Sequence, residues 1–183
     1  MEEYGLILNL HGESPPGDDI TILDAEEIFL PTLFDLHRRF PRLHIVLEHC
    51  TTATAVEAVK ACGPNVVGTI NPHHMLIIII DDWANDLFNY CKHVAKLPAD
   101  RLALITTTAS GNPKFFLGTD SAPHALSAKR GGGDGMGKCA AEVFTQLHAT
   151  QLVLEAFEGI MEKGILKSEA LSKDVLTGFL GEF

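Results

Sequence analysis

The residues that could do chemistry in this sequence are histidines and an aspartate that each follow a short aliphatic segment. They are His11, His49, the pair His73 and His74, and Asp120. Neutral imidazoles and a carboxylate are the ligands with which proteins hold a hydrolytic zinc ion, and such an ion lowers the pKa of bound water. One histidine of this kind is weak evidence, because an isolated histidine more often makes a hydrogen bond than binds a metal. Several at equivalent places favour a metal site.

The elements that must position these residues alternate between strand-like and helix-like segments. Buried strands are expected at 5–10, 44–48, 66–70 and 115–118, and helices at 25–39, 52–62 and 100–109. This order predicts parallel strands joined by helical crossovers, and therefore an α/β fold. Ligands bind at the carboxyl ends of parallel strands, which is where the histidines and Asp120 fall.

The last third of the chain is expected to be mostly helical. A glycine-rich stretch at 131–137 lacks the context of a phosphate-binding loop and is interpreted as a flexible connector. A helical pattern then runs from Val143 to Ile160 and is expected to stop at Gly164. Ser168 is a suitable N-cap for a last helix that ends near Phe179.

Composition limits the class of protein. The chain has 183 residues, of which 46% are hydrophobic and 21% charged, as expected for one globular domain, or part of one, over 1–183. Its net charge of −10 argues against nucleic acid as a partner. No secretory leader is recognised and the aliphatic run at 75–80 is too short to span a membrane, so a cytoplasmic location is expected. Four widely spaced cysteines favour reduced packing thiols.

Four motifs carry a resemblance to a known family. They are LHGE at 10–13, LEHCTT at 47–52, INPHH at 70–74 and GTDSAPH at 118–124. In order and spacing they resemble the dihydroorotases of the amidohydrolase superfamily. DDW at 81–83, NYCK at 89–92 and VAKLP at 94–98 are similar to the monofunctional fungal enzymes in particular. The resemblance implies the C-terminal half of a (β/α)8 barrel, with strands five to eight and their helices.

The resemblance also implies metal-binding and catalytic roles. His11 and His49 would bind one ion of a two-zinc pair, and Asp120 would bind the other and carry a proton. The implied reaction is the reversible hydrolysis of dihydroorotate to N-carbamoyl-aspartate in pyrimidine biosynthesis.

Three further residues would bind the substrate. His124 would hydrogen-bond its carboxylate, while backbone groups near Lys92 and Ala141 would orient the ring. Glu13 and Glu48 are expected to support neighbouring ligands rather than to react.

The chain departs from the family pattern at several points. The His-x-His pair and the bridging lysine that complete the two-zinc site are missing, His93 stands where the fungal motif has proline, and Glu142 stands where it has glycine. The chain alone is therefore expected to bind metal weakly and to lack useful activity, and a complementary N-terminal half or a second copy is the expected protein partner. His93 itself is expected, with His37, His44 and His148, to be a surface or packing residue. Two alternatives stay open: another cyclic amidohydrolase of the hydantoinase kind, and a non-catalytic structural partner.

Overall fold

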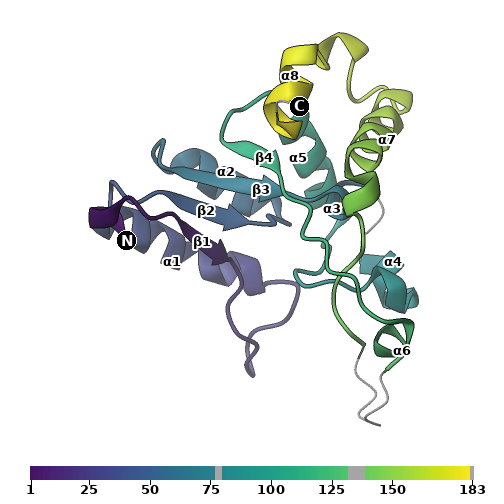
Figure 1. The fold of residues 1–183 in the computed structure, drawn as a ribbon, viewed down its shortest axis with the longest axis horizontal. Helices are drawn as coiled ribbons and strands as arrows, with labels where there is room; N and C mark the ends of the chain where they lie inside the picture. Colours follow the sequence, from purple (N-terminus) through teal and green to yellow (C-terminus); the bar gives the residue numbers. More distant parts are fainter. Residues whose placement is uncertain (77–79, 132–138, 182–183) are drawn as a thin grey trace.

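The chain folds around one sheet of parallel strands. In the computed structural model, which describes residues 1–76, 80–131 and 139–181, the four strands lie in the order β1-β2-β3-β4. They are β1 (Leu8–His11), β2 (Ile45–Glu48), β3 (Val66–Ile70) and β4 (Phe115–Leu117), side by side in Figure 1. The prediction of an α/β fold with parallel strands is confirmed, and sequential parallel strands with helical connections are consistent with part of a TIM barrel.

The register of the sheet brings the strand ends to one edge. His11 pairs with Glu48, the last residue of β2, and Ile70 pairs with Leu117 at the ends of β3 and β4. Because the strands are parallel, the residues that follow them emerge on the same side of the molecule.

Helices connect the strands and extend beyond them. The α-helices are α1 (Ala25–Arg39), α2 (Ala53–Ala61), α3 (Pro72–Met75), α4 (Ile80–Asn85), α5 (Pro98–Ala109), α6 (Leu126–Lys129), α7 (Ala149–Glu162) and α8 (Lys173–Leu180). Short 3₁₀ helices lie at Glu2–Tyr4, Leu87–Asn89, Gln146–His148 and Ser168–Ala170. Thr52 caps α2, because its hydroxyl accepts a hydrogen bond from the Ala55 backbone N–H at 3.0 Å.

The core lies between the sheet and its helices. Leu33 of α1, Ile45 and Leu47 of β2, and Leu104 of α5 are almost completely buried. The buried face of α7 repeats with helical spacing through Val153, Ala156, Phe157 and Ile160. The apolar pattern of the sequence therefore specifies which helix faces meet the sheet.

Three expected boundaries differ from the structure by more than two residues. The first strand begins at Leu8 rather than residue 5, because a 3₁₀ turn precedes it and ends at Gly5 with φ of 64°. Helix α7 begins at Ala149 rather than Val143, because tertiary hydrogen bonds hold the preceding segment in a non-helical conformation. The cap of α8 is Ser172, whose hydroxyl accepts from Val175, whereas Ser168 begins a 3₁₀ turn. The connector expected at 131–137 lies, from residue 132 onward, outside the described residues.

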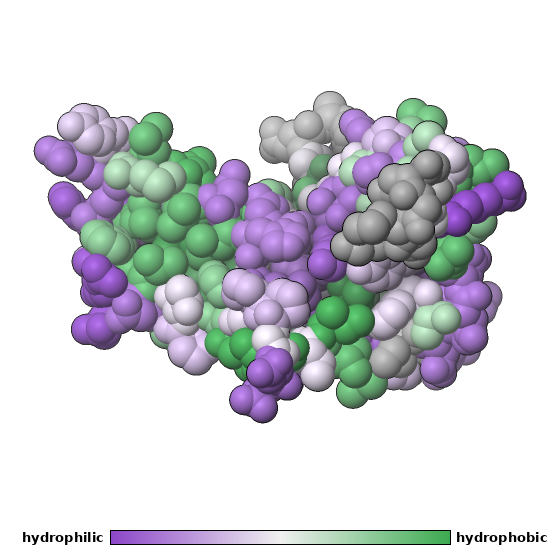
Figure 2. All heavy atoms as spheres, turned by 90° about the horizontal axis from the view of Figure 1, so that it is seen from below, coloured by the Kyte–Doolittle hydropathy of each residue, from purple (hydrophilic) through white to green (hydrophobic). Residues whose placement is uncertain are grey.

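An apolar surface accompanies β1. Within the described part of the chain, β1 pairs only with β2. Figure 2 shows apolar side chains gathered over the part of the molecule that holds β1 and α1. The large exposed apolar residues of these segments include Leu6 and Ile7, just before β1, and Ile28 of α1. None of the described helices has the length and apolar character needed to cross a membrane.

Candidate metal centre

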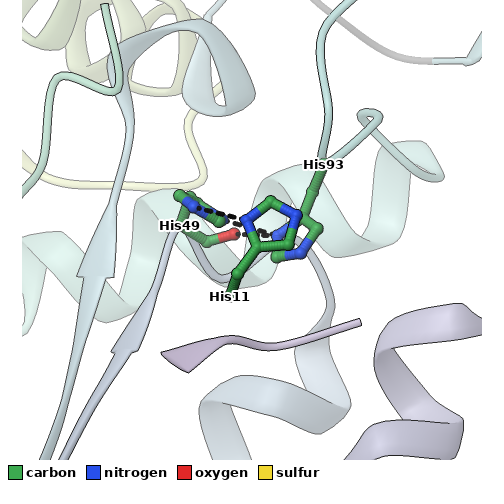
Figure 3. Close-up of side chains that lie close together, drawn as sticks. All are labelled: His11, His49 and His93. Carbon is green, nitrogen blue, oxygen red and sulfur yellow. Dashed lines mark hydrogen bonds between the residues drawn. The ribbon is translucent and has the colours of Figure 1, made fainter. Parts of the chain in front are cut away.

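Three histidines meet where β1 and β2 end. His11 is the last residue of β1, His49 follows β2, and His93 lies in the segment before α5. Their rings point toward one another in Figure 3, with centroids 4.2 to 4.7 Å apart. One nitrogen of each ring lies within 4.8 Å of a nitrogen of the other two. This histidine trio is therefore a candidate metal centre.

His49 is the central member of the trio. Its Nε2 lies 3.2 Å from His11 Nδ1, and its Nδ1 lies 2.6 Å from His93 Nδ1. Its backbone has φ of 43°, in the left-handed region, and its N–H donates to Thr69 Oγ1 at 2.6 Å. The Thr69 hydroxyl in turn donates to Glu48 at 2.8 Å. Adjacent strands β2 and β3 thus fix the turn that aims the His49 ring.

His93 is fully buried and has a carboxylate behind it. Its Nε2 has no hydrogen-bond partner and lies 3.7 Å from Glu13 Oε2. Lys96 holds Glu13 in place, because its ammonium group lies 3.0 Å from the other carboxylate oxygen and also donates to the Ile22 carbonyl. The ring is therefore held between His49 on one side and an ion pair on the other.

The trio suits a metal electrostatically. Burial, with the neighbouring His11 adding to the effect, lowers the pKa of His49 to about 3. Burial likewise lowers the pKa of His93 to about 2, with His49 and His11 adding to the effect. Both imidazoles are neutral at pH 7, which is the form that coordinates a metal. The donor set fits one zinc ion held by nitrogen ligands.

Asp120 stands at the end of β4 beside an unexpected carboxyl group. Its φ is 42°, and burial raises its pKa while the nearby His11 opposes that rise. Burial raises the pKa of Glu142 to about 7, and the negative charge of Asp120 contributes to this shift. Glu142 also has φ of 107°, a conformation that favours glycine. The departure from the family's glycine at position 142 thus places two carboxyl groups next to each other.

The expected substrate-binding residues line two pockets. Lys92 and Ala141 line one of 530 Å³, together with Trp83 and Tyr90. His124 lines another of 330 Å³, which it shares with Glu142. The structure therefore places Lys92 and Ala141 in one pocket and His124, with Glu142, in another.

Lys129 connects the two chain segments that line these pockets. Its ammonium group is buried and donates to the carbonyls of Tyr90, Ala140 and Glu142 at 2.9 to 3.1 Å. The two chain segments that bear the expected substrate contacts are joined through this one side chain.

Two features were missed at the sequence level. His93 was expected to be a surface or packing residue, yet it belongs to the trio; its only signal was its place in a motif where the fungal enzymes have proline. His73 and His74, which also follow an aliphatic segment, are buried beside Cys91 and form with it a second group of close donor atoms. No local sequence feature predicts either grouping, because each depends on how distant segments fold together.

Known proteins match the chain in sequence. No family model matches it. It is 56% identical over 158 residues to "Probable dihydroorotase" of Schizosaccharomyces pombe, covering 86% of this chain and 45% of that protein. It is 41% identical over 196 residues to the dihydroorotase of Saccharomyces cerevisiae, covering all of this chain and 50% of the relative. The chain spans about half the length of these curated relatives.

Solved structures agree with the sequence matches. The Saccharomyces cerevisiae dihydroorotase, solved in complex with 5-fluoroorotic acid, matches with a TM-score of 0.78 and 40% identity over 98% of this chain and 51% of that one. The Campylobacter jejuni dihydroorotase matches with a TM-score of 0.71 and 32% identity over 98% of this chain and 47% of that one. A hydantoinase from Arthrobacter aurescens, at 17% identity and a TM-score of 0.68, shares the fold. In sequence and in fold, this chain is a homologue of about half of a dihydroorotase.

Proposed function

We propose that the chain supplies part of a dihydroorotase active site, which hydrolyses the cyclic amide of dihydroorotate to N-carbamoyl-aspartate and runs in reverse. The observation that carries the proposal is that His11 and His49 meet at adjacent strand ends, where His11 also affects the pKa of Asp120. The chain that brings these residues together is 56% identical to a probable dihydroorotase. A cytoplasmic location and a role in pyrimidine biosynthesis belong to the same proposal.

Zinc is the cofactor that these residues would hold. His11 and His49 would bind one ion, and Asp120 would bind a second. When bound, zinc would polarise the scissile carbonyl and favour deprotonation of water.

Asp120 would move the proton of the reaction. A water molecule adds to the ring carbonyl carbon, and the Asp120 carboxylate accepts its proton. The carbon–nitrogen bond then breaks, and Asp120 returns that proton to the leaving nitrogen. One carboxyl group thus acts as base and then as acid.

The substrate would lie against the two pockets. The His124 imidazole would hydrogen-bond the substrate carboxylate, and backbone groups of Lys92 and Ala141 would orient the ring. Lys129 supports this arrangement, because it fixes the carbonyls on either side of Ala141.

The ligand set of this chain is incomplete for two ions. The sequence contains no His-x-His pair, and a catalytic zinc usually has three protein ligands. We therefore propose that the chain is inactive alone and acts with a polypeptide that supplies the remaining strands. The apolar surface around β1 supports this partner over a second copy, because a barrel would continue at that edge.

The test is turnover on mixing. The chain would be purified, supplied with zinc and assayed for dihydroorotate hydrolysis, alone and with the separately expressed part of the Schizosaccharomyces pombe relative that it does not cover. We expect turnover only in the mixture, lost with Asp120→Asn and kept with Asp19→Asn, an exposed control. Turnover by the chain alone would refute the need for a partner, and a stable but inactive mixture would favour a purely structural role.

A further inference from the structure

We infer that this chain by itself forms a mononuclear site for a transition-metal ion such as zinc, in which His93 is a third ligand beside His11 and His49. The inference shares two ligands with the proposed function but does not depend on turnover. It adds a ligand at a position where the family motif that the chain resembles has proline, which cannot coordinate a metal.

The geometry of the nitrogens carries the inference. Ligand atoms around a tetrahedral zinc ion stand roughly 3.3 Å apart, since each lies about 2.0–2.1 Å from the metal. The trio places its rings in contact, with nitrogen pairs at 3.2 Å between His11 and His49 and at 2.6 Å between His49 and His93. His49 faces its two neighbours with different nitrogens, Nε2 toward His11 and Nδ1 toward His93, so its ring must turn to present one nitrogen to a common ion. One nitrogen of each ring already lies within 4.8 Å of the other two.

The surroundings of His93 are those of a metal ligand. A coordinating histidine usually presents its other ring nitrogen to a carboxylate, which fixes its tautomer and orientation. His93 turns Nδ1 toward His49, 2.6 Å from its Nδ1 and 3.2 Å from its backbone carbonyl oxygen, and leaves Nε2, buried and otherwise unpartnered, 3.7 Å from Glu13. Glu13 is itself held by Lys96.

The trio also has an open side. His11 is exposed, whereas His49 and His93 are buried. An ion can therefore enter from the His11 side and keep one position for water. By contrast, the second donor group, of His73, His74 and Cys91, is buried throughout.

Zinc binding to the metal-free chain tests the inference. We expect one equivalent of zinc to bind in competition with a chromophoric chelator, and cobalt(II) in the same site to give the visible absorption of tetrahedral coordination. His93→Asn should weaken zinc binding by at least about tenfold, and Glu13→Gln by about tenfold. His44→Asn is the matched control, since His44 is exposed and outside the trio.

Two further variants separate ligation from folding. His93→Cys should retain binding, because a thiolate also coordinates zinc. His73→Leu should bind as the unchanged chain does. The inference is overturned if His93→Asn, shown by circular dichroism to be folded, binds zinc as tightly as the unchanged chain. It is also overturned if His73→Leu is the variant that loses zinc binding and His93→Asn is not. Neither readout involves dihydroorotate, so an inactive mixture with intact His93-dependent binding would count against the proposed function alone.

Discussion

Glu26 should make the stability of this chain fall as pH rises. Its carboxylate is fully buried in α1 and accepts hydrogen bonds of 2.9 Å from both the backbone N–H and the hydroxyl of Thr51, two residues beyond His49. Burial nevertheless raises its pKa from 4.5 to about 7, because these bonds only partly offset the loss of hydration. At pH values between 4.5 and about 7, Glu26 is therefore mostly protonated in the folded chain and mostly ionised in the unfolded chain.

The magnitude follows from linkage. A shift of this size corresponds to about 3 kcal/mol of folding free energy, which is present below the unfolded pKa of 4.5 and lost as pH rises through about 7. Glu26→Gln keeps an acceptor for the Thr51 N–H but cannot ionise. Between about pH 5 and about pH 8, we expect the stability of this variant relative to the unchanged chain to improve by about 2–3 kcal/mol.

Urea unfolding at the two pH values measures this difference. The buried histidines give the opposite slope, because their lowered pKa values destabilise the fold as pH falls, but they are present in both proteins and cancel. Glu27→Gln is the control, since Glu27 is exposed on the same helix turn. If Glu26→Gln and the unchanged chain lose stability in parallel across this range, the argument from burial is wrong.

Two predictions concern the loops around Asp120. Glu142→Gly should be more stable than Glu142→Ala by about 1 kcal/mol in urea unfolding. Both variants remove the carboxyl group, but alanine keeps a Cβ at φ of 107°. Equal unfolding midpoints would show that the backbone at residue 142 is not strained. Lys129→Met should lower the free energy of unfolding by about 3 kcal/mol, measured in urea, because three carbonyls lose a charged donor. A decrease of less than about 1 kcal/mol would show that water replaces the ammonium group.

The sequence predicted well those elements whose signals are local. Helix α1 has the expected bounds, and α2 lies within the expected range between its caps, because helical periodicity and a capping threonine lie within the segments themselves. The start of α7 was wrong because Leu147 fits the helical period but lies outside the α-helix with 76% of its surface exposed. The Thr145 N–H donates to the Ser121 hydroxyl and the Lys129 ammonium group donates to the Glu142 carbonyl, and these tertiary hydrogen bonds outweigh that local preference.

The candidate site was predictable in part for the same reason. His11 and His49 each follow an aliphatic strand, so parallel pairing alone predicts that they meet. His93 follows no strand and is 44 residues from His49, and its approach depends on the path of an irregular segment. Only the folded chain reveals that the residue departing from the family motif is in contact with both expected ligands.

The two departures from the family motif, His93 and Glu142, affect different parts of the proposed reaction: His93 affects metal binding, and Glu142 affects proton transfer. His93 adds a neutral nitrogen where His11 and His49 already gather, which favours holding one ion. Glu142 adds a carboxyl group beside Asp120, and this group competes for the proton that Asp120 would carry and adds negative charge where an anionic substrate would approach. Metal affinity and amide hydrolysis therefore need not change together in this chain. We therefore expect the complemented chain to turn over dihydroorotate more slowly than the intact Schizosaccharomyces pombe relative while it keeps its zinc affinity.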